Sequence, residues 1–110
     1  MDLALKTDTH DGWTILVVEG ELDLHTSPQL QRALWDMIDQ GTTHVAIDLS
    51  GVPFMDSSSL GVIVGGLKRA REQGGDLALM SLQPSPAKVI ALTGLDGVFR
   101  IVDDASRLTS

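Results

Sequence analysis

Short runs of β-branched and apolar residues alternate along this chain with stretches in which apolar residues recur every three or four positions. The first pattern is typical of strands and the second of helices. Their alternation predicts an α/β fold: a single domain, residues 1–110, with a mixed, mostly parallel sheet and helices packed on it. The predicted strands are 3–7, 13–19, 45–49, 77–82 and 98–102, and the predicted helices follow Ser27-Pro28 as far as Gly41, run from Ser58 to Gln73, and run from Ser85-Pro86 to Gly94.

Two turn signals refine this picture. His10-Asp11-Gly12 separates the first two strands, and Asp-Gly favours a tight turn, so the chain is predicted to open with an antiparallel hairpin. In the middle helix the pair Gly65-Gly66 costs helix stability. Close approach of that helix to the sheet or a neighbouring helix is the preferred explanation, and a landing place for a partner is the alternative. Trp35 lies off the apolar stripe of the first helix and is expected at the edge of the core.

The segment 52–61, Val-Pro-Phe-Met-Asp-Ser-Ser-Ser-Leu-Gly, combines a carboxylate with three hydroxyls where a predicted strand gives way to a helix. Unpaired N–H groups and the positive end of the helix dipole meet at such a junction. An anion, such as a phosphate group on a serine, is therefore expected to be received favourably there. Helix capping accounts for one of these polar side chains, but the remaining hydroxyls are not needed for the cap.

Composition narrows the class of function. The formal charge of −7 over 110 residues argues against nucleic-acid binding and against anionic membranes, and favours a protein partner with a basic face. The chain has no cysteine, no leader-like segment and no run of about 18 apolar residues, so we expect a cytoplasmic protein. No metal site or cofactor is predicted, because His10 and His44 lack partners at metal-ligand spacing.

Four separated segments carry a resemblance to a known family: Gly20-Glu21-Leu22-Asp23, residues 54–58, residues 60–68, and Thr93-Gly94-Leu95. In this order, and over nearly the whole chain, they resemble the STAS domain of bacterial anti-sigma factor antagonists. The resemblance implies a non-enzymatic protein that binds an anti-sigma factor, itself an ATP-dependent serine kinase, and so frees the sigma factor. That partner would inactivate it by phosphorylating one serine, and a metal-dependent serine phosphatase would reverse the modification.

The resemblance also assigns residues. It implies Ser57 as the phosphorylated serine, with Ser58 as the alternative, and it implies a partner surface made of Asp23, His25, Met55, Asp56, Ser58, Ser59 and Leu60. Ser59 stands where the family usually has glycine. Serine is acceptable at that position if it is already helical, whereas a positive φ would force the loop to shift.

Other classes of protein fit the sequence less well. An acyl carrier protein is all-helical, a receiver domain needs an acidic pair after its first strand, and a serine hydrolase needs a histidine base or a Gly-x-Ser-x-Gly elbow. A STAS module that scaffolds complexes without serine phosphorylation remains open. The sequence leaves undetermined the cognate anti-sigma and sigma factors, the triggering signal, nucleotide binding and the oligomeric state.

Overall fold

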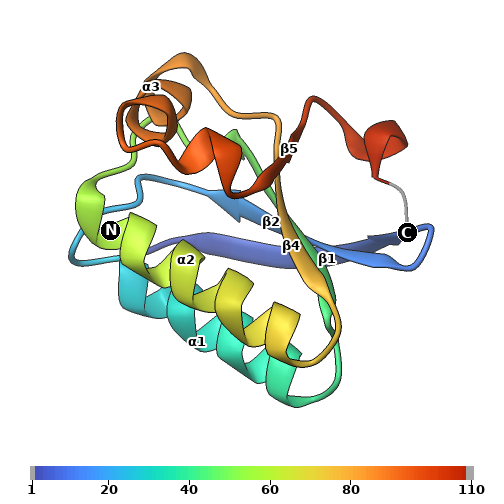
Figure 1. The fold of residues 1–110 in the computed structure, drawn as a ribbon. Helices are drawn as coiled ribbons and strands as arrows, with labels where there is room; N and C mark the ends of the chain where they lie inside the picture. Colours follow the sequence, from blue (N-terminus) through green and yellow to red (C-terminus); the bar gives the residue numbers. More distant parts are fainter. Residues whose placement is uncertain (1, 109–110) are drawn as a thin grey trace.

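The hydrophobic strands pair into one five-stranded sheet in the computed structural model, which describes residues 2–108 (Figure 1). The strand order is β1-β2-β3-β4-β5; β1 is antiparallel to β2, and all other pairs are parallel. The fold class predicted from the sequence is therefore confirmed. The elements are β1 Ala4–His10, β2 Trp13–Glu19, α1 Ser27–Asp39, β3 His44–Gly51, α2 Ser57–Glu72, β4 Asp76–Met80, α3 Pro84–Leu92, η1 Leu95–Gly97, β5 Arg100–Val102 and η2 Ala105–Arg107.

The predicted hairpin is confirmed, and its loop consists of Asp11 and Gly12. Both residues have positive φ values, 48° and 85°, which suits the twist of a two-residue hairpin. Helices α1 and α2 lie side by side on one face of the sheet (Figure 1). Between these helices and the sheet lies the main core, to which every strand except β5 contributes an apolar residue.

The opposite face of the sheet carries a smaller apolar cluster under the C-terminal segment. It consists of Trp13, Ile15, Ala46, Ala78, Met80 and Leu108. For the end of the chain, residues 103–110, the sequence allows one or two helical turns; the structure forms the short turn η2 there, and residues 109–110 lie outside the described residues.

The glycine pair of α2 sits where the helix packs most closely. A Cβ on Gly66 would lie 3.1 Å from Leu77 Cδ1 of β4 and 3.2 Å from Leu34 Cδ1 of α1, and a Cβ on Gly65 would lie 2.9 Å from Trp35 Cη2. Close approach is therefore confirmed as the reason for the glycines. Trp35 is half-buried against the core, as predicted, and Arg69 stacks on its ring at 4.8 Å.

Several predicted boundaries are wrong, each for a local reason. Helix α1 begins at Ser27 itself, with Thr26 at the N-cap position, because an upstream turn, in which the Ser27 N–H donates to the Asp23 carbonyl, leads directly into it. Helix α3 begins at Pro84, one residue before Ser85. Strand β4 ends at Met80, since Ser81 adopts a positive φ of 60°.

The last strand is shorter than predicted. It begins at Arg100, because the N–H groups of Val98 and Phe99 both turn back to the carbonyl of Leu95. None of these shifts moves the segment 52–61, which links β3 to α2 and includes the first residues of α2.

Candidate functional site

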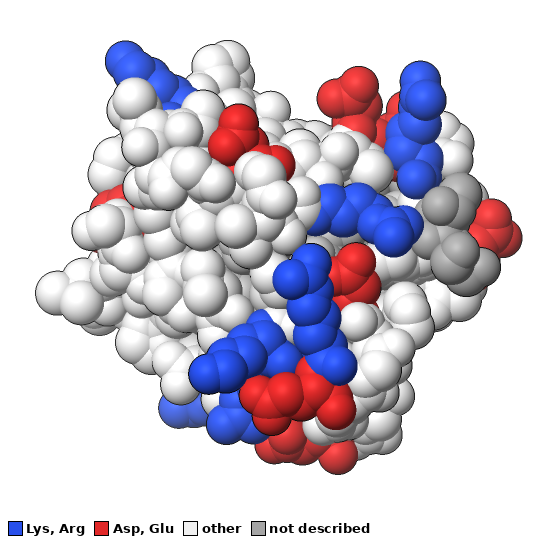
Figure 2. Space-filling view, viewed as in Figure 1, with Lys and Arg blue, Asp and Glu red and all other residues white. Residues whose placement is uncertain are grey.

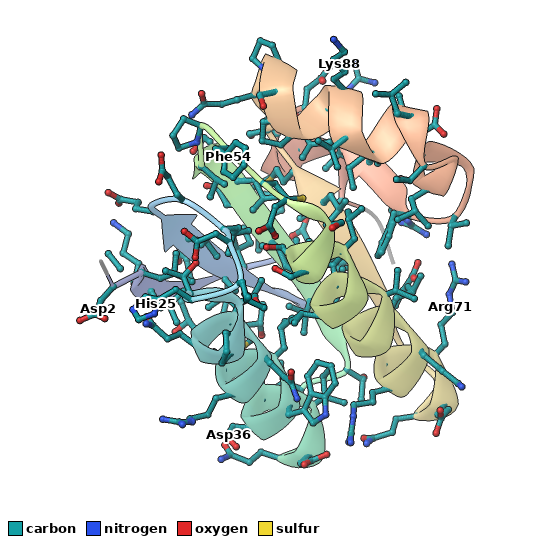
Figure 3. All side chains as sticks on the ribbon, turned by 90° about the vertical axis from the view of Figure 1, so that its left-hand side faces the viewer. Asp2, His25, Asp36, Phe54, Arg71 and Lys88 are labelled. Atoms are coloured by element: carbon teal, nitrogen blue, oxygen red, sulfur yellow. The ribbon has the colours of Figure 1, made fainter. Side chains whose placement is uncertain are left out.

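Two segments that follow β2 and β3 lie side by side at the carboxyl edge of the sheet. The N–H of Gly20 donates to the carbonyl of Gly51, and that of Leu22 to the carbonyl of Phe54, both at 3.0 Å. In return, the N–H of Asp56 donates to the Leu22 carbonyl at 3.0 Å. The peptide group that precedes Asp23 is thus bonded directly to Asp56. Figure 3 shows His25 and Phe54 at this end of the molecule, far from Arg71 at the other end of α2.

Asp56 is the N-cap of α2 and organises the start of the helix. Its Oδ1 accepts hydrogen bonds from the Ser58 N–H at 3.0 Å and the Ser59 N–H at 3.3 Å. The same oxygen accepts the Ser58 hydroxyl at 2.5 Å and lies 3.4 Å from the Ser59 hydroxyl. This cap explains why α2 begins at Ser57, one residue before the predicted start at Ser58.

The cap keeps the Asp56 carboxylate ionised. Burial works against ionisation, but the hydrogen bonds from Ser58 and Ser59 outweigh it and hold the pKa of Asp56 below its ordinary value. A fixed negative charge therefore stands at the start of α2 at neutral pH. This corrects one expectation from the sequence: two of the N–H groups predicted to receive a phosphate, those of Ser58 and Ser59, already donate to Asp56.

The three consecutive serines occupy three different environments. Ser57, the first residue of α2, is exposed, and its hydroxyl has no hydrogen-bond partner within the described part of the chain. Ser58 is half-buried with its hydroxyl bound to Asp56. Ser59 is fully buried. Its φ is not positive, so the side chain that replaces the usual glycine fits the helical position without strain.

A second aspartate shapes the neighbouring segment in the same manner. Asp23 Oδ1 accepts the N–H groups of His25 and Thr26, each at 2.9 Å, and the Thr26 hydroxyl at 3.2 Å. The Thr26 N–H has the largest influence on the Asp23 carboxyl. Together with the Thr26 hydroxyl and the His25 N–H it holds the pKa of Asp23 below its ordinary value, against a smaller opposing effect of burial. Two ionised carboxylates thus belong to adjacent segments.

Comparison with known proteins places this arrangement in a family. The family model of the STAS domain matches residues 4–107. The chain belongs to the STAS family. The anti-sigma-B factor antagonist of Staphylococcus epidermidis is 34% identical over 101 residues, which cover 92% of this chain and 94% of that protein.

Solved structures of other STAS proteins share the fold. A putative anti-sigma factor antagonist from Thermotoga maritima superposes with a TM-score of 0.87 at 32% identity, covering 93% of this chain and 88% of that one. The anti-sigma factor antagonist SpoIIAA matches in its unphosphorylated form, with a TM-score of 0.78, 26% identity, and coverage of 94% and 90%. The phosphorylated form of Bacillus SpoIIAA matches with a TM-score of 0.72, 25% identity, and coverage of 94% of each chain. These relatives are regulatory proteins.

Three of the residues predicted for the partner surface of this STAS domain have buried side chains. Met55 is 1% exposed, Ser59 0% and Leu60 7%; Met55 and Leu60 belong to the main core, and the Ser59 hydroxyl faces Asp56. Their side chains support the site from below and are too buried for a partner to contact. Asp23, Asp56 and Ser58 are half-buried, and His25 is exposed.

Two exposed apolar residues near the STAS motif were missed in the sequence. Leu24 is 76% exposed and Phe54 is 45% exposed, and they belong to the two segments joined by the Leu22 and Asp56 hydrogen bonds. Strand periodicity places Leu24 on the same buried side as Leu22. The Asp23 turn breaks that periodicity and turns Leu24 outwards. Recognising Asp23-x-x-Thr26 as a capped turn is the signal that finds it.

The distribution of charge separates the two ends of α2. Figure 2 shows Lys and Arg, with Asp and Glu among them, over the second half of α2 and towards β5, while the surface towards the start of α2 in this view is largely uncharged. Lys68, Arg69 and Arg71 belong to that second half. The exposed hydroxyl of Ser57 therefore lies at the opposite end of α2 from these charged residues.

No arrangement suited to a metal ion occurs within residues 2–108. No three His, Asp or Glu side chains gather there in a way that would hold a cation. The His44 ring packs edge-on against Trp13, with centroids 5.3 Å apart, and His10 lies 3.6 Å from Asp11. None of the helices in the same range combines the length and apolar character required to span a membrane.

Proposed function

We propose that this STAS domain is an anti-sigma factor antagonist that is switched off by phosphorylation of Ser57. Its partner is an anti-sigma factor that is also an ATP-dependent serine kinase, and binding to that partner frees the sigma factor. A metal-dependent serine phosphatase restores the active form. The protein acts in the cytoplasm by association and catalyses no reaction of its own.

The observation that carries the proposal is the free, exposed hydroxyl of Ser57, which directly follows the ionised Asp56 in a segment bonded to the Asp23 segment. Ser58 and Ser59 have the same functional group, but the first is bound to Asp56 and the second is buried. A kinase active site needs an oxygen that it can approach, so Ser57 is favoured over the alternative Ser58. The two SpoIIAA structures, phosphorylated and unphosphorylated, support a modification cycle in a protein of this fold.

The switch is electrostatic. A phosphoryl group adds about 1.5 to 2 negative charges at neutral pH. On Ser57 this charge would stand next to ionised Asp56, whose carboxylate already occupies N–H groups at the start of α2. The dianion therefore lacks a ready counter-charge, and at a partner surface formed against a neutral hydroxyl it is desolvated without compensation.

Leu24 and Phe54 complete the proposed contact surface. Each of the two hydrogen-bonded segments contributes one of these residues, and apolar area removed from water on binding stabilises a protein interface. Exposed Asp23, His25, Asp56 and Ser58 atoms form its polar part. The buried residues Met55, Ser59 and Leu60 support the surface without taking part in contact.

The test requires a partner kinase. Bacterial anti-sigma factors are first screened for ATP-dependent labelling of the wild-type chain. The positive kinase is then titrated calorimetrically with wild type, Ser57→Ala and the matched control Ser85→Ala, which replaces an exposed serine on α3. Ser57→Ala is expected to bind as wild type does but to accept no phosphate, whereas Ser85→Ala accepts it normally. Tight binding with no phosphorylation of any serine would instead establish the scaffold alternative.

A further inference from the structure

The hydrogen bonds at the start of α2 divide the three adjacent serine hydroxyls into one that is free and two that are not. Asp56 Oδ1 receives the Ser58 hydroxyl at 2.5 Å and also receives the Ser58 and Ser59 backbone N–H groups. The Ser59 side chain lies beneath, fully buried and 3.4 Å from the same oxygen. One carboxylate oxygen therefore holds both of the serines that follow the exposed Ser57.

Phosphoryl transfer from ATP makes specific demands on a serine hydroxyl. The hydroxyl oxygen forms a bond to the γ-phosphorus, the bond from that phosphorus to the β,γ-bridging oxygen breaks, and ADP leaves. The hydroxyl proton passes to a base of the kinase. Ser58 must give up its bond to Asp56 before its oxygen can take this path. Ser57 has no such bond to break among the described residues.

We propose that Asp56 is a positioning residue that selects the phosphorylated serine, by tethering Ser58 and leaving Ser57 as the one hydroxyl free to attack. This inference rests on the proposed function. A hydrogen bond to an ionised acceptor favours the free hydroxyl over the tethered one by about tenfold to a hundredfold. The order of residues then determines the phosphosite, because Asp56 binds the hydroxyl of Ser58, the second serine, and not that of Ser57, the first.

The same geometry argues against an alternative mechanism, in which Asp56 activates Ser58 as a general base. A base for this step must give the hydroxyl proton a favourable destination. Asp56 Oδ1 accepts two backbone N–H groups as well as the Ser58 hydroxyl, and these bonds stabilise its ionised form. The carboxylate is therefore a weak base and a strong tether.

Phosphosite mapping tests the proposal. Wild type, Asp56→Ala and Asp56→Asn are incubated with the screened kinase and ATP, and the peptide that contains residues 52–68 is analysed by fragmentation mass spectrometry. In wild type the phosphate is expected almost entirely on Ser57. In Asp56→Ala the share on Ser58 is expected to rise about tenfold or more. Asparagine retains the accepting oxygen, so Asp56→Asn is expected to restore the preference for Ser57.

Two controls separate selection from loss of structure. Asp104→Ala removes an equivalent cap, in which Asp104 Oδ1 accepts the N–H and the hydroxyl of Ser106, at a distance from the site. It is expected to leave the distribution unchanged. Circular dichroism confirms that every variant is folded, and Asp56→Ala/Ser58→Ala is expected to lose the second phosphosite.

The possible outcomes distinguish this inference from the function on which it rests. Phosphate that stays on Ser57 in folded Asp56→Ala overturns selection by Asp56 while leaving the switch at Ser57 intact. Phosphate found on Ser58 in the wild type overturns both the selection and the assignment of Ser57. A wild-type chain that binds its partner but is modified on no serine removes the phosphorylation switch itself, and the selection with it.

Discussion

The segments 20–26 and 51–59 lie side by side and are built with the same device. In each, an aspartate follows a strand and accepts the N–H groups two and three residues ahead of it, together with a hydroxyl. In each the pKa of that aspartate is held below its ordinary value. The two segments differ in what remains after the turn has been made.

In the first segment no hydroxyl is left over. Thr26 is 3% exposed, and its Oγ1 donates to the Glu21 carbonyl at 2.6 Å. The second segment has three hydroxyls where the turn uses at most two, and the surplus one, on Ser57, is exposed. The aspartates in these loops therefore stabilise the turns. Ser57, whose hydroxyl the turn does not use, is the candidate for function.

Charge placed on Ser57 is expected to have the largest effect. Phosphorylated protein should bind the partner kinase more weakly by a few hundredfold, roughly 3 to 4 kcal/mol, and Ser57→Glu should show the same sign with a smaller loss. His25→Glu adds a charge to an exposed residue of the segment 20–26 and is compared with Ser57→Glu. Calorimetry at fixed salt compares them. Equal affinity of Ser57→Glu and wild type would refute the electrostatic switch.

Substitution of Leu24 or Phe54 is expected to cause the next largest loss of affinity. It tests whether both segments contact the partner. Leu24→Ala and Phe54→Ala should each weaken binding by about tenfold, since each removes apolar area at the centre of the proposed contact. Leu92→Ala is the control, because Leu92 is as exposed as Leu24, at 76%, but lies on α3. If only Phe54→Ala weakens the complex, the first segment is a structural neighbour and no part of the contact.

The sequence predicted the sheet and the helices well because their patterns are periodic over many residues. The same periodicity predicted the packing role of Gly65 and Gly66, since glycine inside a helix demands a reason. Boundaries were less predictable. The start of α2 depends on which N–H groups the Asp56 carboxylate reaches, and the start of α1 follows a turn in which the Ser27 N–H donates to the Asp23 carbonyl. Such local turns leave no periodic trace.

The candidate site was only partly accessible to sequence reasoning. The motif located Ser57 and Asp56, but all three serines look alike in one dimension, and only the hydrogen bonds separate them. Burial removed Met55, Ser59 and Leu60 from the expected contact surface, and the Asp23 turn added Leu24. Leu60 is buried because it belongs to the apolar face of α2, and Leu24 is exposed because the Asp23 turn breaks the strand alternation.

A smaller effect, on stability, tests whether the two aspartates play the same role. Asp56→Ala should lower the free energy of unfolding by about 1 kcal/mol, as expected for loss of an N-cap, and Asp56→Asn should recover most of it. Asp23→Ala should change stability in the same direction. Urea denaturation measures these values, with exposed Asp96→Ala as the control. A destabilised Asp56→Ala beside an unaffected Asp23→Ala would show that only the second segment relies on its cap.

The pH dependence of stability is expected to be the smallest effect and applies to both segments. Each carboxyl has a folded-state pKa below the ordinary value of 3.8, so the folded protein binds these protons less readily than the unfolded chain does. Their stabilising contribution is therefore complete above the unfolded pKa and is lost as the pH falls through the folded pKa. Urea denaturation at several pH values below about 5 should show wild type losing stability on acidification more steeply than Asp56→Asn/Asp23→Asn, which keeps accepting oxygens but cannot ionise. Parallel slopes for the two proteins would mean that neither turn stabilises the ionised form of its aspartate. The two segments would then share a backbone geometry but not its electrostatic effect.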